Sequence, residues 1–233
     1  MSLTHFLIDL SERGLVPDFL IRAGIRNLCR KRLQQCKHDD CEANAELAEK
    51  YIADSDASPM AVLTEKANQQ HYEVPAEFYR HALGKNLKYS SCYYDSNTKS
   101  LDDAEDRALA LTSEHAKLEN GLDILELGCG WGSLSLWMAK HFPDSQITSI
   151  SNSNSQREYI LGQARNRGYE NLKVITADIN EFTTDSTYDR VVSVEMFEHV
   201  RNHRELFSRI HGWLKSGGKL FTHVFCHRST SYP

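Results

Sequence analysis

The second half of the chain alternates short apolar runs with longer amphipathic segments. Apolar runs bounded by turn residues predict buried strands, and the segments between them have the length and spacing of helices. The predicted strands are residues 122–127, 145–150, 171–178, 188–194 and 219–225. The predicted helices follow the first, second and fourth strands and end near His141, Gly168 and Gly218. Strands connected by helices in this way run parallel, so the pattern predicts an α/β fold with a doubly wound sheet.

The first seventy residues lack this alternation and are predicted to be helical. Pro17 and Asp18 mark a helix start, and apolar residues follow at helical spacing from Phe19 to Leu28. Arginines and a lysine between Arg22 and Arg32 form the other face, which we interpret as solvated rather than as a surface for a membrane or an acidic partner. The predicted organisation is an N-terminal helical extension, 1–70, and a domain from 71 to 233.

Composition is that of an ordinary globular protein and excludes several classes of partner. The 233 residues are 40% hydrophobic and 25% charged, with a net charge of −5, so no bulk attraction to nucleic acid or to an anionic membrane is expected. The apolar runs are too short to span a bilayer, and the start of the chain lacks a basic leader, so a cytoplasmic location is expected.

The six cysteines are scattered without a CxxC pair, which favours reduced thiols over a disulfide framework. The stretch CKHDDC, residues 36–41, could supply metal ligands. No second ligand cluster stands at a usual spacing from it, so a polar loop is the better interpretation and no metal is expected.

A glycine-rich turn follows the first predicted strand. Gly128 and Gly130 would let a ligand approach the backbone, and the next helix would present free N–H groups. Ser133 replaces the third glycine of a dinucleotide-binding turn, and residues 149–156 contain no acid to hold a ribose. A nicotinamide oxidoreductase is therefore the least favoured function. Glu126, two residues before Gly128, completes instead a pattern that resembles the one used by S-adenosyl-L-methionine (SAM) methyltransferases.

Six motifs in order carry a wider resemblance. They are KYSSCYY (88–94), LELGCGWGSLSL (125–136), SNSNSQ (151–156), TADINEF (176–182), VSVEMFEHV (192–200) and FTHVFCH (221–227). Together they resemble the cyclopropane fatty acid synthase superfamily of SAM-dependent methyltransferases, most of all its coclaurine N-methyltransferase-like branch. The resemblance implies a Rossmann-like class I methyltransferase sheet. It also implies further C-terminal strands, so we expect the chain as given to be truncated at that end.

The same resemblance implies the residues that hold the cofactor, SAM. Tyr89 and Ser90 match a pair that closes over its methionyl end, and the amides of Asn152 and Gln156 would bind ribose hydroxyls in place of the missing acid. Asp178 and Ile179 match the adenine contacts, although Asp178 could instead cap a helix. The complete set of implied cofactor residues is Tyr89, Ser90, Glu126, Gly128, Gly130, Ser151, Asn152, Gln156, Asp178, Ile179 and Val194.

Glu195, Glu198 and His199 follow the fourth predicted strand and raise the question of the substrate. An aliphatic amine is mostly protonated at pH 7, so its methylation requires groups that bind the ammonium and take its proton. These three residues could do so, and the resemblance places them in the acceptor site. The alternative is an ordinary helix start with two carboxylates.

Two departures distinguish branches of the superfamily. Cyclopropane synthases resemble this chain at Glu198 and His223, which match holders of their bicarbonate, but carry glycine at position 195 and cysteine at position 91. Here these positions are Glu195 and Ser91, and an added carboxylate favours a cationic acceptor over bicarbonate. The predicted function is SAM-dependent N-methylation of a small amine, with Glu195, Glu198, His199 and His223 as catalytic residues. A lipid methyltransferase acting on an acyl chain and an inactive SAM-binding protein remain alternatives, and the oligomeric state is left open.

Overall fold

The computed structural model describes residues 3–35, 41–62 and 75–226. Contacts between Cα atoms divide the chain into two compact units. One comprises residues 1–53 with 227–233, and the other comprises residues 54–226. The metal candidate at 36–41 lies almost wholly outside the described residues, with only Cys41 inside them.

The N-terminal unit is helical, as its sequence predicts. It contains α1 (Leu3–Glu12), α2 (Asp18–Gln35) and most of α3 (Cys41–Asp56). Ion pairs one turn apart join Arg13 to Asp9 and Arg22 to Asp18, at 3.1 and 2.7 Å. Such exposed pairs stabilise a helix only slightly.

The second unit is built around one parallel sheet with the strand order β3-β2-β1-β4-β5. Its strands are β1 (Asp123–Leu127), β2 (Gln146–Ser151), β3 (Leu172–Thr176), β4 (Tyr188–Val194) and β5 (Leu214–His223). Its helices are α5 (Ala76–Ala82), α6 (Leu101–His115), α7 (Ser133–His141), α8 (Asn154–Arg167), the 3₁₀ turn η2 (Phe197–His199) and α9 (His203–Trp213). The predicted doubly wound α/β fold is confirmed.

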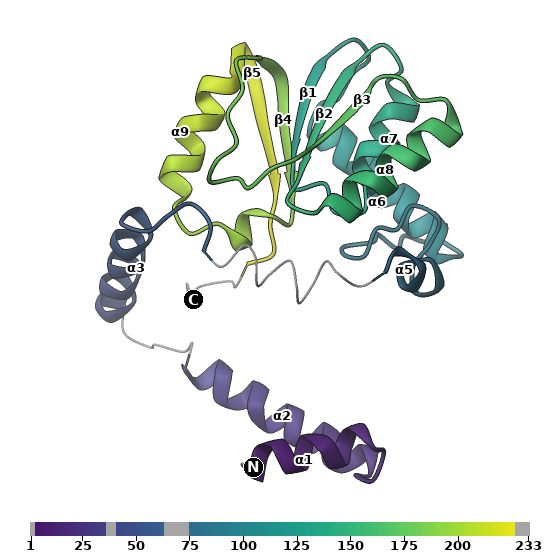
Figure 1. Ribbon diagram of the computed structural model, residues 1–233. Coiled ribbons are helices and arrows are strands. Elements are labelled where there is room, and N and C mark those ends of the chain that lie inside the picture. The colour runs from purple at the N-terminus through teal and green to yellow at the C-terminus, as the bar shows by residue number, and fades with distance from the viewer. Residues whose placement is uncertain (1–2, 36–40, 63–74, 227–233) are drawn as a thin grey trace. The chain divides into compact units, whose positions relative to one another are not determined.

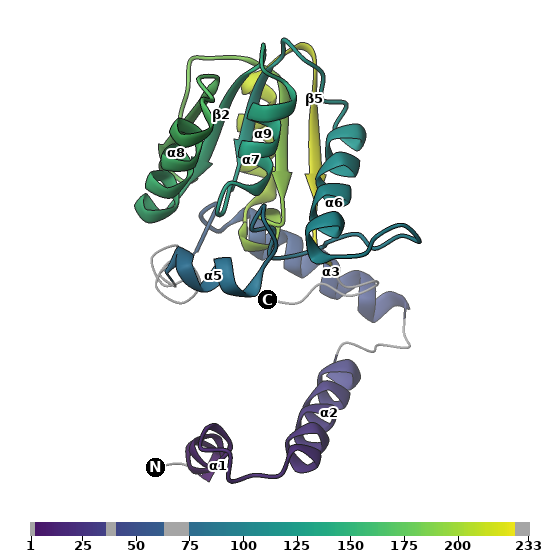
Figure 2. The ribbon, with the colours of Figure 1, turned by 90° about the vertical axis from the view of Figure 1, so that its right-hand side faces the viewer.

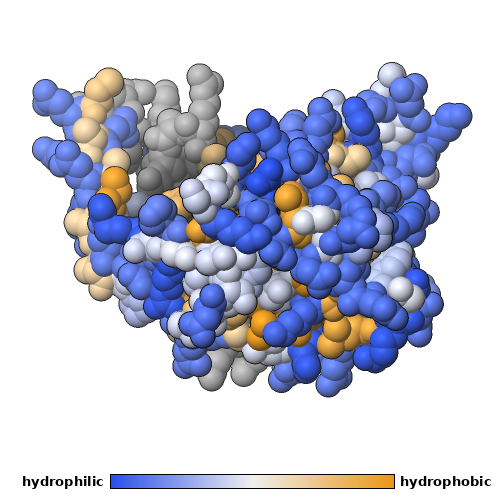
Figure 3. Space-filling view, turned by 90° about the horizontal axis from the view of Figure 1, so that it is seen from above, coloured by the Kyte–Doolittle hydropathy of each residue, from blue (hydrophilic) through white to orange (hydrophobic). Residues whose placement is uncertain are grey.

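Helices cover both faces of the sheet, with α6, α7 and α8 on one side and α9 on the other (Figures 1 and 2). Alternate residues of β1 enter different cores because successive side chains of a strand point to opposite faces. Ile124 packs in the core under α7 and α8, whereas Leu125 and Leu127 pack in the core under α9. Viewed from above, on the side where the strands begin, the surface is mostly hydrophilic with scattered hydrophobic residues (Figure 3).

The third strand ends at Thr176 and not at residue 178, and larger differences from the predicted boundaries lie at the last helix and strand. The helix predicted to continue to Gly218 ends at Trp213, because Leu214 already pairs with Tyr188 in the sheet. Residues 215–218 interrupt the regular pairing of β5 with β4, which resumes at Lys219. The double glycine, Gly217 and Gly218, therefore lies in a strand bulge and not at a helix end.

The unit that holds the sheet begins at Asp54, whereas the sequence placed a boundary near residue 70, a position outside the described residues. Long-range contacts explain the earlier start. Met60 is buried, its carbonyl accepts a hydrogen bond from Arg201 N, and Ala61 forms a β-bridge with Val200. These contacts join segments far apart in the chain, so no local pattern could indicate them.

The sheet order places a topological switch point between β1 and β4. The strands on its two sides are connected in opposite directions, which leaves a crevice at their carboxyl ends where α/β proteins bind ligands. No helix among the described residues is both long and apolar enough to cross a bilayer.

Candidate active site

A cavity opens at the carboxyl ends of β1 to β4, and its empty space, with the open solvent at its mouth counted, is about 1140 Å³. Every residue predicted to contact the cofactor lines this cavity: Tyr89, Ser90, Glu126, Gly128, Gly130, Ser151, Asn152, Gln156, Asp178, Ile179 and Val194. Glu195 and His199 line it as well. The structure therefore brings these side chains to one space, and the role of each stays a prediction.

The glycine-rich turn after β1 forms one wall of the cavity, which we call the cofactor wall (Glu126–Gly132). Gly128 N and Cys129 N donate to the carbonyl of Ile150 at 3.1 and 3.0 Å, which fixes the turn against β2. Gly130 has a φ of 50° and lines the cavity. A Cβ at Gly130 would meet only Tyr89 Cε1, at 3.6 Å, so the glycine leaves open the room that a side chain would take.

Glu126 is a buried carboxyl group in this wall. On the face of β1 that packs against α7, it accepts hydrogen bonds from Ser135 Oγ and, at 2.7 Å, from Ser149 Oγ. Burial raises the pKa of Glu126 to about 7, although the two hydroxyls favour the ionised form. The group therefore changes charge near neutral pH, which the sequence motif did not indicate.

Among the polar residues at the end of β2 and the start of α8, Gln156 lines the cavity and has a hydrogen-bond donor without a partner among the described residues. Ser151 Oγ donates to Gln156 Oε1 at 2.8 Å, and Ser153 N donates to Ser151 Oγ at 3.1 Å. Gln156 is 1% exposed, and its Nε2 has no hydrogen-bond partner among the residues described. A buried donor without a partner is costly, so this amide fits a wall that receives a polar ligand.

Asp178 begins a turn rather than the helix that its capping alternative required. Its Oδ1 accepts from Asn180 N at 2.8 Å, and the residues after it form a turn. Asn180 in turn bonds Ala61 in both directions, at 2.9 and 3.0 Å. This turn thus ties the segment before residue 63, which the sequence did not connect with the site, to the cavity wall.

Glu195 is held by backbone and side-chain bonds. We define the acceptor side as Glu195 and His199, which line the cavity, together with Lys88 and Ser91, which lie behind Glu195 and line a neighbouring hollow. Glu195 N donates to the carbonyl of His223 at 2.7 Å, and Ser91 Oγ donates to its carboxylate. Burial opposes the charge, but hydrogen bonds from Ser90 and Ser91 and the nearby Lys88 and His223 outweigh it, so the pKa of Glu195 is lowered. The group is an anion at neutral pH.

Lys88 is a charged residue near Glu195 that sequence reasoning missed. Only 6% of it is exposed, and its Nζ donates to the carbonyl of Ser90 at 2.7 Å. Burial lowers the pKa of Lys88, and the negative charge of Glu195 opposes that shift. A lone lysine before Tyr-Ser looks like a surface residue, because nothing in the sequence shows that Glu195 lies near it.

The remaining predicted catalytic residues take different positions. His199 lines the cavity at the end of η2, whose first residue, Phe197, is buried. Glu198 does not line the cavity, and its carboxylate accepts from Phe225 N. His223 lines a second hollow, together with Lys88 and Ser91. Glu195 and His199 are therefore the two predicted catalytic side chains that face the cofactor residues.

Among the residues described, no group of three or more histidine, cysteine or acidic side chains is arranged to hold a metal ion. Five of the cysteines are described, and all five are free thiols: Cys29, Cys41, Cys92, Cys129 and Cys226. Cys129 lines the cavity, where burial raises the pKa of its thiol well above the ordinary value.

Comparison of the chain with known proteins shows which family it belongs to. The family model described as mycolic acid cyclopropane synthetase matches residues 62–232. The structure resembles a crystal structure of coclaurine N-methyltransferase bound to N-methylheliamine and SAH, with a TM-score of 0.94 and 34% identity. That match covers 99% of this chain and 67% of the other.

Curated relatives show the same similarity at the level of sequence. (S)-Coclaurine N-methyltransferase from Thalictrum flavum subsp. glaucum is 37% identical over 97% of this chain. The cyclopropane-fatty-acyl-phospholipid synthase of Escherichia coli (strain K12) is 28% identical over 70% of it. The chain spans 63% of the length of the first relative and 41% of the second.

Proposed function

The chain belongs to the mycolic acid cyclopropane synthetase family, and we propose that it is a SAM-dependent N-methyltransferase that acts on a small amine. One observation carries this proposal. The cofactor wall and the pair formed by Glu195 and His199 line the same cavity, so a methyl donor and an acceptor bound there would meet.

Two features of the cavity fit SAM. Gly130 leaves its Cβ position open toward the cavity, and Gln156 presents a buried donor without a partner among the described residues. We assign the methionyl end to Tyr89 and Ser90, the ribose to Asn152 and Gln156, and the adenine to Asp178 and Ile179. SAM supplies a methyl group on a positively charged sulfur, and SAH is bound in the solved N-methyltransferase.

The acceptor side would prepare the amine. An ammonium has no lone pair to give, so it must lose a proton before nitrogen can form a bond to carbon. The anionic carboxylate of Glu195 attracts the cation and orients it. The imidazole of His199, on the same cavity, is the base that takes the proton. Alignment of the reacting atoms by these groups supplies the rest of the acceleration.

The similarity to amine methyltransferases is also broader than the similarity to lipid enzymes. The Thalictrum relative matches over 97% of this chain and the E. coli lipid enzyme over 70%. The carboxylate at Glu195, where cyclopropane synthases are expected to carry glycine, supports the same choice. The cytoplasmic location expected from the sequence stays a prediction.

The test is methyl transfer from SAM by the full chain to a panel of primary, secondary and tertiary amines and, separately, to vesicles of unsaturated phospholipid. Calorimetry with SAH is measured in parallel. We expect SAH binding and methylation of at least one amine. Transfer to the phospholipid alone would establish the lipid alternative, and SAH binding with neither transfer would establish an inactive binding protein. A chain that does not bind SAH would overturn the proposal.

A further inference from the structure

A segment between α5 and α6 is bonded to α6 and also reaches both sides of the cavity. This anchored segment, Gly84–Ser91, carries Tyr89 and Ser90 on the cavity wall and ends at Ser91, which donates a hydrogen bond to Glu195. It has no regular secondary structure. Its conformation must therefore be fixed by contacts with other elements.

One buried carboxylate accepts three of the six hydrogen bonds that the segment donates to α6. Glu105 of α6 is fully buried and accepts hydrogen bonds from three backbone N–H groups of the segment, those of Gly84, Asn86 and Lys88, at 3.0, 2.7 and 3.1 Å. Hydrogen bonds to an ionised acceptor are stronger than those between neutral groups. The carboxylate of Glu105 thus holds the backbone of the segment against α6.

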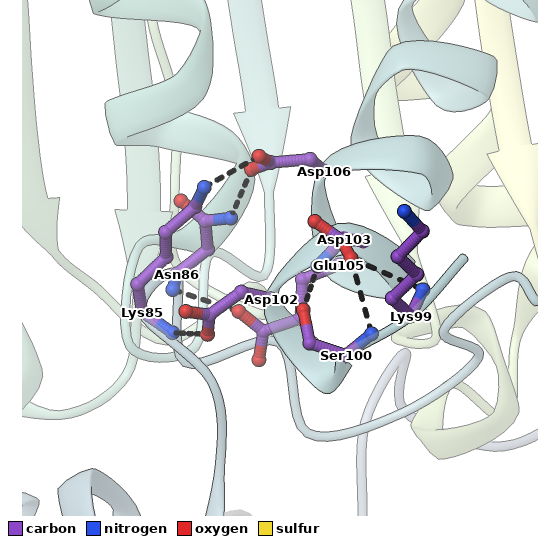
Figure 4. Close-up of polar contacts among 8 residues, drawn as sticks. All are labelled: Lys85, Asn86, Lys99, Ser100, Asp102, Asp103, Glu105 and Asp106. Atoms are coloured by element: carbon purple, nitrogen blue, oxygen red, sulfur yellow. Dashed lines mark hydrogen bonds and ion pairs between the residues drawn. The ribbon is translucent and has the colours of Figure 1, made fainter. Parts of the chain in front are cut away.

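Two further acids on the same face of α6 hold the beginning of the segment (Figure 4). Asp102 Oδ1 accepts from Lys85 N at 2.7 Å. Asp106 accepts from Lys85 Nζ at 2.6 Å and from Asn86 Nδ2 at 2.7 Å. The fit leaves no room for a side chain at Gly84, where a Cβ would lie 2.6 Å from Asp102 Oδ1.

The part of the segment that reaches the cavity has a residue in an energetically unfavourable backbone conformation at each end. Leu87 and Ser91 have φ values of 52° and 54°. Left-handed conformations of residues other than glycine persist only where the surroundings impose them. The bond from Lys88 N to Glu105 lies directly after the first of these residues, and the bond from Lys88 Nζ to the carbonyl of Ser90 lies between the two.

We propose that Glu105 is a positioning residue for both halves of the reaction. Through Lys88 it places Tyr89 and Ser90 against the cofactor and Ser91 against the carboxylate of Glu195. This inference rests on the proposed function, since it assumes that the cavity binds SAM. It assigns a role to the acidic stretch LDDAED, which in the sequence is indistinguishable from an exposed helix face.

A matched control lies two residues away. Asp103, on the other side of the helix start, accepts from Ser100 N and Lys99 N at 3.0 and 3.1 Å and completes a capping box (Figure 4). Its hydrogen bonds at the helix start go to Lys99 and Ser100, outside the anchored segment. Removing it weakens the start of α6 but leaves the anchors of the segment in place, so it reports what loss of helix stability alone does to binding.

The experiment compares Glu105→Gln and Asp103→Asn in the full chain by SAH calorimetry and by KM and kcat for SAM and amine. Circular dichroism at the assay temperature confirms that both are folded. Misplacement of about 1 Å can cost about 10²-fold, so Glu105→Gln should weaken SAH binding and lower kcat by roughly that factor. Asp103→Asn should leave both within about twofold, although both variants unfold at lower urea concentration.

Should Glu105→Gln fail to fold, Asp102→Ala and Asp103→Ala carry the same comparison, because both lie in the first turn of α6 and only Asp102 contacts the segment. Asp102→Ala should weaken SAH binding several-fold and Asp103→Ala should not. Equal SAH affinity in the two members of either pair would overturn the positioning role while the proposed function stands. A wild-type chain that binds no SAH would overturn both.

Discussion

The two sides of the cavity use left-handed backbone conformations differently. In the cofactor wall they occur at three glycines, whose φ values lie between 50° and 82°. Around the acceptor side they occur at Leu87, Ser91 and Glu195, with φ values of 52–54°. This conformation raises the free energy of a residue with a side chain by about 1–2 kcal/mol, whereas glycine adopts it without that cost.

The difference shows what each side contributes. Two glycines of the cofactor wall, Gly128 and Gly132, have no space for a side chain, whereas Gly130 faces the open cavity. A Cβ would lie 2.7 Å from Met196 at Gly128 and 2.5 Å from Ile160 at Gly132. On the acceptor side the chain retains side chains despite the cost, and at Ser91 and Glu195 these side chains bond each other. In the proposed function, backbone shape would therefore receive the cofactor and side-chain chemistry would serve the acceptor.

The largest expected effect comes from breaking the acceptor side alone. His199→Ala should lower turnover by roughly 10²–10⁴-fold, the factor typical of a lost general base, with SAH affinity nearly unchanged in calorimetry. His211→Ala, an exposed histidine on α9, is the control and should keep full activity. If His199→Ala turns over at the wild-type rate, the base lies elsewhere.

Substitutions at two glycines of the cofactor wall should impair different properties, stability at Gly132 and SAH binding at Gly130. Gly132→Ala places a methyl group against Ile160 and should lower the free energy of unfolding by about 2–4 kcal/mol, from overpacking and backbone strain together. Gly130→Val has open space before it and should instead abolish SAH binding, with a smaller loss of stability. Urea unfolding and calorimetry on both variants separate the two losses. Equal SAH affinity of Gly130→Val and wild type would contradict the assignment of this wall.

Glu126 makes the cofactor wall sensitive to pH. Its pKa in the folded protein, about 7, lies above the ordinary value of 4.5, so folding favours the protonated form. The stability that this form contributes is complete below about pH 4.5 and is lost as pH rises through 7, by about 3 kcal/mol in total. Urea unfolding between pH 5 and 8 should show this decline for wild type and not for Glu126→Gln. Glu158→Gln, at an exposed position, should decline as wild type does.

The smallest effect concerns the strain at Glu195. Glu195→Gly and Glu195→Ala both remove the carboxylate, so both should lose amine methylation. Only glycine also relieves the left-handed conformation, and we expect its variant to be more stable than the alanine variant by about 1 kcal/mol. Thermal unfolding of the pair measures the difference. An amine rate in Glu195→Gly equal to that of wild type would remove the best support for N-methylation.

The sequence by itself determined the sheet and the set of residues that meet at its carboxyl edge. Runs such as 122–127 and 188–194 are apolar enough to be buried on both faces, and parallel strands must end at the same edge. Residues at or directly after the ends of those strands, among them Gly128, Asp178 and Glu195, were therefore predictable as neighbours. This information is local, because periodicity and turn residues act over a few positions.

Only the tertiary structure decided the environment of each charge. Glu105, Lys88 and Glu126 are all buried, yet in the sequence each resembles an exposed residue of a helix, a loop or a strand end. Their partners are distant in the sequence: Glu126 accepts a hydrogen bond from Ser149, and Lys88 lies near Glu195. The solvation and pKa of a charged group depend on what surrounds it in space. Long-range packing fixes those surroundings, and no run of neighbouring residues records them.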